Sequence, residues 1–404
     1  MKRGYLSDYF DGIAAKRLSA VEADMTRSHQ HELNGVERLK QLFGPASERR
    51  MYSARFLYLT DDEHAPLVAD GTLTWYDARE RHPTRSEHRL YFPANPVMDK
   101  ARAGDLLVIA RRPAGTVLLV VAEQGSTVAN QVQWLFGTEN LTDARYVVRD
   151  DLNAERHRIA AAKRAILEQI GIEVEPPPDA HLNDMLRRFG GAFPNTRVFS
   201  EYARGTVRDV DCCDDPDATL LAYMEREEQL FRTLERHLVG VRLEQGFVRD
   251  VDGFVAFSLA VHNRRKSRAG YALENHLESL LSGQGIRFAR TTTTENRSKP
   301  DFLFPGASEY QDAHFSSGRL TVLAVKTSCK DRWRQVLAEA DRVLQKHLLT
   351  LEPAITTAQT DEMQTRNLRL VIPRPIHTTY SSDQQQWLMS VSEFIELVKI
   401  RQRG

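Results

Sequence analysis

RLTVLAVK, from Arg319 to Lys326, is a short run of apolar and β-branched residues that predicts a buried strand. Lys326 ends the run, so we expect its ammonium group at the tip of that strand. The tripeptide Lys-Pro-Asp301 precedes it, and apolar residues recur at helical spacing from Trp333 to Leu348 after it. The second half of the chain is therefore predicted to be an α/β domain whose mixed sheet carries Asp301 and Lys326.

Two glutamates lie at the edges of apolar helical stripes. Glu339 belongs to the helix expected after Lys326, and Glu274 borders a stripe of leucines in a second helix expected over Tyr271–Leu281. Taken singly, each glutamate would be an ordinary boundary residue in a surface salt bridge. Their order along the chain with Asp301 and Lys326 favours a shared site beside the core.

The set of Asp301, Lys326 and Glu339 indicates metal-dependent phosphodiester chemistry. Carboxylates hold a divalent cation, and an ammonium group steadies the negative charge that develops on the phosphate. We expect Mg²⁺ to be held by Asp301 and Glu339, with Glu274 as a further or water-mediated ligand. The Pro-Asp…Lys pattern is weak when taken alone, because many chains contain it by chance.

Three longer blocks resemble the EcoRII family of restriction endonucleases. They are NRRKSRAG at 263–270, KPDFLFP at 299–305, and AVKTSCKDRWRQ at 324–335 followed by Glu339. The resemblance implies a restriction-endonuclease-like fold with a variant PD-(D/E)xK site, in which the glutamate beside the lysine has moved to the following helix. Here Ala324 stands two residues before Lys326, and Glu339 supplies the moved carboxylate.

The resemblance also implies individual roles. The implied catalytic set is Glu274, Asp301, Lys326 and Glu339, joined by Arg265 and Tyr310. The implied readers of the C·G pairs, in a target of the form CC-(one base pair)-GG, are Lys330, Asp331 and Arg332. Lysine and arginine can donate to guanine, and aspartate can accept from cytosine. Without the resemblance, these three residues would indicate only a solvated helix N-terminus.

The implied activity is that of a type II (IIE-like) enzyme that cuts double-stranded DNA and leaves 5′-phosphate ends. A near-palindromic target requires a two-fold symmetric reader, so we expect a homodimer. A cytosine methyltransferase is expected in the same system, although not as a bound partner. Two alternatives remain open: a sequence-specific DNA-binding regulator on a catalytically inactive nuclease fold, and a repair or modification-dependent nuclease.

The composition is that of an ordinary globular protein. The 404 residues include 55 basic and 55 acidic ones, and a net charge of zero argues against non-specific coating of nucleic acid. The three cysteines lack zinc-site spacing and are expected to be unpaired thiols in a reducing bacterial cytoplasm. The N-terminus lacks the apolar core of a signal peptide, and no apolar run approaches membrane-spanning length, so no membrane association is expected.

The clearest boundary is EVEPPPD at 173–179, because three consecutive prolines cannot continue the helix expected over Ala154–Ile170. We therefore predict a multi-domain chain. The expected parts are an N-terminal domain over 1–153, a helix and Pro-rich linker over 154–179, and the nuclease domain over 180–404.

The N-terminal domain is predicted to be β-rich. Strands are expected at Arg55–Thr60, Thr72–Tyr76, Asp105–Ala110 and Thr116–Ala122, and a closed or half-closed barrel is the usual arrangement for such a run. A weaker part of the same resemblance implies a DNA-binding pseudobarrel that acts as an effector domain.

In that effector domain, the residues implied to contact a second copy of the target are His29, Arg85, Glu87, His88 and Arg89. His88 stands where the family pattern has lysine, and a histidine that is mostly neutral at pH 7 would make a weaker phosphate contact. The alternative for His29 is a hydrogen-bonded histidine of the domain without a role in DNA contact.

Overall fold

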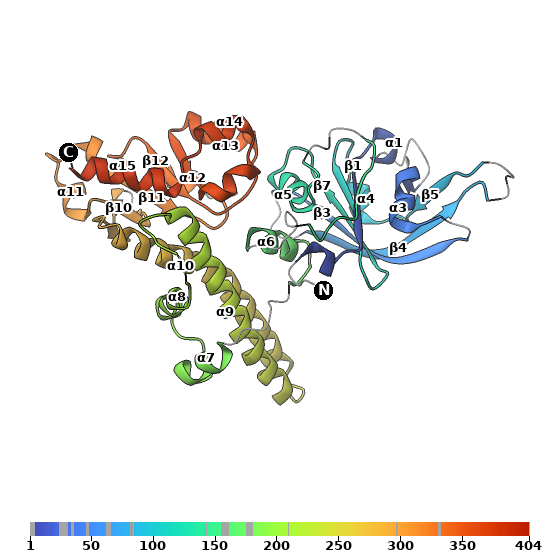
Figure 1. Cartoon of the computed structure of the whole chain (residues 1–404), viewed down its shortest axis with the longest axis horizontal. Coiled ribbons are helices and arrows are strands. Elements are labelled where there is room, and N and C mark those ends of the chain that lie inside the picture. The colour runs from blue at the N-terminus through green and yellow to red at the C-terminus, as the bar shows by residue number, and fades with distance from the viewer. Residues whose placement is uncertain are drawn as a thin grey trace. The chain divides into compact units, whose positions relative to one another are not determined.

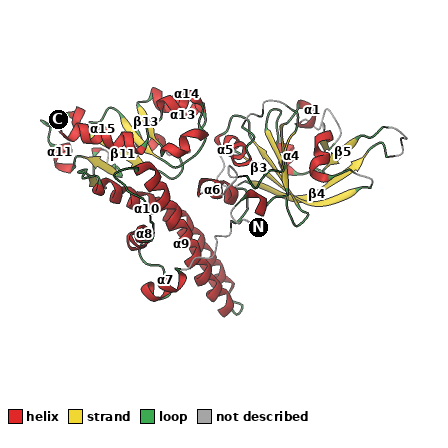
Figure 2. Ribbon diagram, in the orientation of Figure 1, coloured by secondary structure: helices red, strands yellow, loops and turns green. Residues whose placement is uncertain are grey.

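The computed structural model divides the chain into two compact units, Met1–Glu175 and Pro176–Gly404 (Figures 1 and 2). The residues that the structure describes are 5–23, 31–33, 36–45, 48–61, 66–80, 82, 85–139, 141, 144–154, 161–174, 181–208, 210–295, 298–329 and 333–403. No helix within these ranges is long and apolar enough to cross a bilayer.

The N-terminal unit is built on a curled eight-stranded sheet with the order β2-β5-β4-β3-β7-β6-β1-β8. Its strands are β1 (Gly12–Arg17), β2 (Glu32–Leu33), β3 (Arg50–Leu59), β4 (Leu67–Asp77), β5 (His88–Tyr91), β6 (Leu106–Arg111), β7 (Val117–Ala122) and β8 (Val147–Arg149). Strand β3 pairs with β7 in parallel, and the other neighbours are antiparallel. The sheet is an open half-barrel, and the four strands expected from the sequence are confirmed as β3, β4, β6 and β7.

An apolar core lies on each face of this sheet. In β6, Leu106 and Val108 face one apolar core, while Leu107 and Ile109 face the other, because successive side chains of a strand point to opposite faces. The helices of this unit are α1 (Ala20–Ala23), α3 (Lys40–Phe43), α4 (Pro96–Lys100), α5 (Thr127–Phe136) and α6 (Ala161–Gln169), with short 3₁₀ turns at Leu6–Asp8 and Val36–Leu39.

Helix α6 falls within the segment expected to be a linker. Its side chains Ile166 and Leu167, with Ile170 just after it, belong to the same apolar core as α5 and the sheet. The described part of this segment is therefore a packed element of the N-terminal unit, because its apolar face is buried on the sheet.

The C-terminal unit has a five-stranded mixed sheet with the order β13-β12-β11-β10-β9. The strands are β9 (Ala289–Arg290), β10 (Phe302–Phe304), β11 (Thr321–Val325), β12 (Lys346–Leu349) and β13 (Leu368–Val371). Strands β11, β12 and β13 are parallel, whereas β10 is antiparallel to both β9 and β11. The strand expected from RLTVLAVK is confirmed as β11.

Helices cover both faces of the C-terminal sheet (Figure 2). They are α7 (Leu182–Phe189), α8 (Thr196–Gly205), α9 (Pro216–Gln245), α10 (Val251–Gly283), α11 (Ala307–Gln311), α12 (Trp333–Val336), α13 (Thr357–Thr365), α14 (Ser382–Trp387) and α15 (Val391–Arg403), with 3₁₀ turns at Ser317–Arg319 and Arg374–Thr379. Helices α9 and α10 form a long hairpin (Figure 1). Leu273 and Leu277 of α10 pack on the sheet, as expected for the leucine stripe.

The helix expected from Trp333 to Leu348 is wrong beyond its first turn. Helix α12 ends at Val336, a turn follows, and His347 and Leu348 lie in strand β12. Ala340 adopts a positive φ of 50°, which an α-helix does not allow. Parallel pairing of β12 with β11 and β13 supplies the backbone hydrogen bonds that a helix would have made, so tertiary pairing overrides the helix-like spacing.

Candidate active site

The sheet topology brings Asp301 and Lys326 together. Strand β10 is antiparallel to β11, with Phe302 opposite Leu323, so the residue before β10 lies at the edge where β11 ends. Asp301 Oδ2 accepts a hydrogen bond from the Val325 backbone N–H at 2.7 Å, and Lys326 Nζ lies 3.2 Å from the same oxygen. The side chains of Lys326 and Asp301 are 26% and 18% exposed, so the pair is accessible to a substrate.

Glu339 lies in the turn after α12, and its carboxylate is the most perturbed acid of the site. Burial, and then the nearby Asp301 charge, raise the pKa of Glu339 to about 7, although Lys326 and Lys346 oppose this shift. Its Oε2 atom is buried and has no hydrogen-bond partner among the described residues. A buried carboxylate oxygen without a partner is costly unless a further group binds it.

Glu274 reaches the same region from α10. Burial, and then Asp301, raise the pKa of Glu274, while Arg290 and Lys326 act in the opposite direction. Arg290 Nη2 donates a hydrogen bond to Glu274 Oε2. Asp301 therefore acts electrostatically on two further carboxylates, one from α10 and one from the turn after α12.

This donor set fits a hard divalent cation. Mg²⁺ takes oxygen ligands, and proteins usually hold it through one or two carboxylates while waters complete its shell. A bound cation would partner the Oε2 atom of Glu339 and would offset the repulsion that Asp301 exerts on Glu339 and on Glu274. These three residues are the ones that could hold it.

Tyr310 is connected to the chain next to Glu339 through Glu295. Its hydroxyl donates to Glu295, and burial followed by this hydrogen bond raises the pKa of Tyr310 above its ordinary value. The Asp341 backbone N–H also donates to Glu295, at 3.3 Å. Tyr310 thus supports the chain around Glu339 through Glu295.

Arg265, which was expected in the catalytic set, lies on α10 in contact with α9. Its Nε donates to Glu235 Oε2 of α9 at 2.7 Å, within the α9–α10 hairpin. The rise along α10 from Arg265 to Glu274 is about 14 Å at ~1.5 Å per residue. The hydrogen bond from Arg265 to Glu235 stabilises the hairpin.

Sequence reasoning missed two cations at this site, Arg290 and Lys346. Lys346 starts β12, and its Nζ donates to the Val343 carbonyl at 3.0 Å. Burial lowers the pKa of Lys346, whereas Asp341, Glu339 and Glu295 act to raise it. Lys346 begins the apolar strand KHLL, whereas Lys326 follows the end of its strand, so the pattern that marked Lys326 does not mark Lys346.

The expected base readers Lys330, Asp331 and Arg332 lie outside the described residues, as does His29. The chain is held immediately before the three readers, where the Cys329 N–H donates to Glu352 Oε2 at 2.5 Å. Immediately after them, Trp333 is fully buried.

The expected effector residues that the structure describes lie in different environments. His88 is buried, with its ring centre 5.0 Å from that of Trp75, whereas Arg85 is exposed. Arg89 pairs with Glu32 at 2.6 Å and with Glu87 at 2.8 Å. Because side chains alternate along β5, His88 and Arg89 point to opposite faces. In this structure the His88 ring packs in the core, and the expected DNA contact of His88 stays a prediction.

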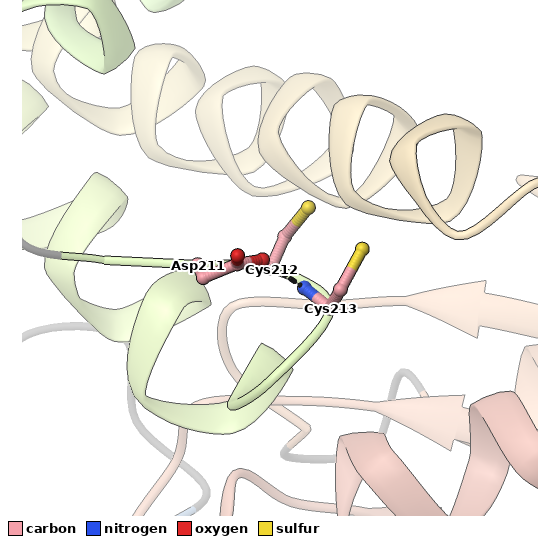
Figure 3. Close-up of side chains that lie close together, drawn as sticks. All are labelled: Asp211, Cys212 and Cys213. Atoms are coloured by element: carbon pink, nitrogen blue, oxygen red, sulfur yellow. Dashed lines mark hydrogen bonds between the residues drawn. The ribbon is translucent and has the colours of Figure 1, made fainter.

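Within the described residues, Asp211, Cys212 and Cys213 are the group of metal-type ligands whose atoms all lie within 4.8 Å of one another. Figure 3 shows both thiols on the same side of their loop. Cys213 Sγ lies 3.8 Å from the Gly283 carbonyl, at the end of α10. Burial, and then Cys213, raise the pKa of the Cys212 thiol, which disfavours the thiolate that binds metals.

Comparisons with known proteins identify the family. Residues 231–395 match the family described as EcoRII C terminal. The chain is 32% identical to the type II restriction enzyme EcoRII of Escherichia coli, over 96% of this chain and 93% of that protein.

The chain belongs to the EcoRII family of type II restriction enzymes. It is therefore a site-specific deoxyribonuclease.

Two solved structures are also similar to this EcoRII-family chain. Metal-depleted Ecl18kI in complex with uncleaved, modified DNA has a TM-score of 0.46 and 16% identity, covering 57% of this chain and 86% of that one. The restriction endonuclease PspGI–substrate DNA complex has a TM-score of 0.43 and 15% identity, covering 52% and 95%.

Proposed function

We propose that this EcoRII-family enzyme cleaves double-stranded DNA at CC-(W or N)-GG sites, where W is A or T, by Mg²⁺-dependent hydrolysis. The observation that carries the proposal is the antiparallel pairing of β10 with β11, which sets Asp301 beside Lys326 next to Glu339. An intact set of this kind favours a nuclease over a regulator that has lost catalysis. The Lys330, Asp331 and Arg332 segment, adjoining β11, would read the C·G pairs.

Each residue of the set has a distinct role in this proposal. Asp301 and Glu339 would hold the cation, with Glu274 as a direct or water-mediated ligand. When bound, Mg²⁺ supplies Lewis-acid polarisation of the phosphate and lowers the pKa of the attacking water. The Lys326 ammonium group orients the water and balances charge on the pentavalent phosphate. Water attacks phosphorus, the bond to the 3′-oxygen breaks, and the products carry a 5′-phosphate and a 3′-hydroxyl.

The α9–α10 hairpin supports a homodimer as the active form. Its distal end exposes apolar side chains, among them Val248 (93% exposed), Val251 (69%) and Leu259 (56%). Exposed apolar residues gathered on one structural element are typical of an interaction surface. A two-fold symmetric reader also suits a near-palindromic target.

We also propose that the N-terminal unit binds a second copy of the target and restrains cleavage until it does so. Its half-barrel carries the exposed Arg85, close in sequence to the Arg89 ion pairs on β5. His88 is left out of this proposal because it is buried.

Digestion of unmethylated DNA carrying several CC-N-GG sites tests the proposal, with fragment ends mapped by sequencing. The wild-type enzyme with Mg²⁺ should give discrete fragments ending at CCWGG or CCNGG, and Lys326→Ala should give none. Ends at unrelated sequences would contradict the assigned site while keeping the chemistry. Absence of cleavage with retained specific binding would favour the regulator.

A further inference from the structure

Arg290 is the last residue of β9, and β9 pairs with β10, the strand that begins directly after Asp301. Backbone pairing sets Arg290 of β9 opposite Phe302 of β10, and its guanidinium carbon lies 5.1 Å from the centre of the Phe302 ring. Strand pairing and ring contact together fix the arginine at the edge of the sheet where the carboxylates gather.

The Arg290 guanidinium joins two carboxylates of α10. Nη2 donates to Glu274 Oε2, and Nη1 donates to Glu278 Oε2 at 2.6 Å. Glu274 and Glu278 stand one helical turn apart, so their side chains are neighbours on one face of α10. The side chains of Arg290, Glu274 and Glu278 are 18%, 21% and 25% exposed, so the bridge is mostly shielded from water.

We propose that Arg290 is a positioning residue that orients Glu274 for its part in metal binding. This inference rests on the proposed function, because it takes Glu274 as a direct or water-mediated ligand. The two oxygens of a carboxylate move together, so a guanidinium that holds Oε2 also fixes the direction of Oε1. Groups that hold metal ligands in this way typically set metal affinity by about 10–100-fold.

The direction in which metal affinity changes on substitution of Arg290 distinguishes a positioning role from an effect of its charge. A guanidinium beside a metal site repels the cation, so removing its charge would by itself strengthen metal binding. Arg290 also lowers the pKa of Glu274, so its removal favours the protonated carboxyl, which binds metal poorly. Weaker binding by Arg290→Lys, which keeps the positive charge, is therefore the result that reports the loss of orientation of Glu274. A lysine at this position keeps the charge, but it cannot span two carboxylates as the planar guanidinium does.

A matched control is available on α8. Arg197 Nη2 lies 2.8 Å from Glu278 Oε2, and its described contacts do not include Glu274. Arg197→Gln therefore removes an ion-pair partner of Glu278 and leaves the ion pair between Glu274 and Arg290 in place.

The experiment is calorimetric titration of Mn²⁺ into the full-length protein without DNA. Arg290→Gln and Arg290→Lys should each weaken Mn²⁺ binding by about tenfold or more, and Arg197→Gln should stay within about twofold of wild type. Equal or tighter binding by Arg290→Gln would overturn the proposal, and so would wild-type affinity of Arg290→Lys. Thermal melts confirm folding, and if Arg290→Gln does not fold, Arg290→Lys alone decides.

Glu274→Gln separates this inference from the proposed function. If Glu274→Gln leaves Mn²⁺ affinity unchanged, Glu274 is no ligand, and the proposed role of that residue fails together with the role of Arg290. If Glu274→Gln weakens binding and Arg290→Gln does not, only the positioning role of Arg290 fails.

Discussion

Lys326 Nζ lies 3.2 Å from Asp301 Oδ2, and the same oxygen accepts a hydrogen bond from the backbone N–H of Val325. The backbone therefore holds the Asp301 carboxylate even when the lysine is changed. A change of Lys326 therefore removes its positive charge from the site without releasing the Asp301 carboxylate, which the backbone still holds.

Lys326→Met should accordingly remove cleavage without removing binding. Loss of one preorganised group that stabilises transition-state charge costs about 10²–10³-fold in rate. Single-turnover cleavage in Mg²⁺ measures this loss, and gel shift in Ca²⁺ measures DNA binding. Lys399→Ala, which removes an α15 lysine paired with Glu396, is the control and should cleave normally. Loss of DNA binding by Lys326→Met would show a structural role instead.

Glu339→Gln should stabilise the metal-free protein at pH 8. The pKa of Glu339 is raised on folding to about 7, so the ionised form destabilises the fold. This cost is absent below about pH 4.5 and complete above about pH 7. Because Glu339 is partly exposed, we expect roughly 1 kcal/mol, or about 2–4 °C in the melting temperature.

Melting curves in EDTA at pH 8 and pH 4.5 measure this difference. Glu396→Gln on α15 is the control, since its side chain is 61% exposed. The melting temperature of Glu339→Gln should exceed that of wild type at pH 8 and equal it at pH 4.5. A lower melting temperature for Glu339→Gln at pH 8 would refute the destabilising charge.

Tyr310→Phe should lower the cleavage rate by less than about tenfold. Its hydroxyl bonds to Glu295, and loss of one such hydrogen bond costs about 0.5–1.5 kcal/mol. Tyr202→Phe removes a comparable hydroxyl, bonded to Asp184 at 2.9 Å, and is the control. A loss as large as that of Lys326→Met would place Tyr310 among the groups that touch the substrate.

Deletion of residues 1–175 should increase cleavage of DNA that carries a single site. The cut falls after the N-terminal unit and removes α6 with the core in which it packs. A cut at 153 would instead leave Ile166 and Leu167 exposed. Initial rates on single-site and multi-site plasmids measure the effect, and an unchanged single-site rate would reject restraint by the N-terminal unit.

The sequence predicted that Asp301 and Lys326 lie close together because the relevant signals are local. An apolar strand ending in Lys326 and a Pro-Asp step before a second strand are short patterns, and antiparallel pairing brings their ends together. The leucine stripe around Glu274 was equally clear, because α10 continues through it without a break.

The sequence failed where long-range pairing decided the structure. The spacing from Trp333 to Leu348 suits a helix, yet His347 and Leu348 pair as β12 between two parallel strands. Arg290 carries no local signal, because its role depends on β9 lying beside β10. The burial of His88 carries no local signal either, because the alternation of β5 within the sheet turns its ring toward Trp75.

The most direct test of the account is single-turnover cleavage of multi-site CC-N-GG DNA by Asp301→Asn and Glu339→Gln beside wild type in Mg²⁺. Binding of the same DNA is measured in Ca²⁺. Both variants should lose at least about 10²-fold in rate while binding DNA specifically. Wild-type cleavage by either variant would contradict the assignment of the active site to the edge between β10 and β11.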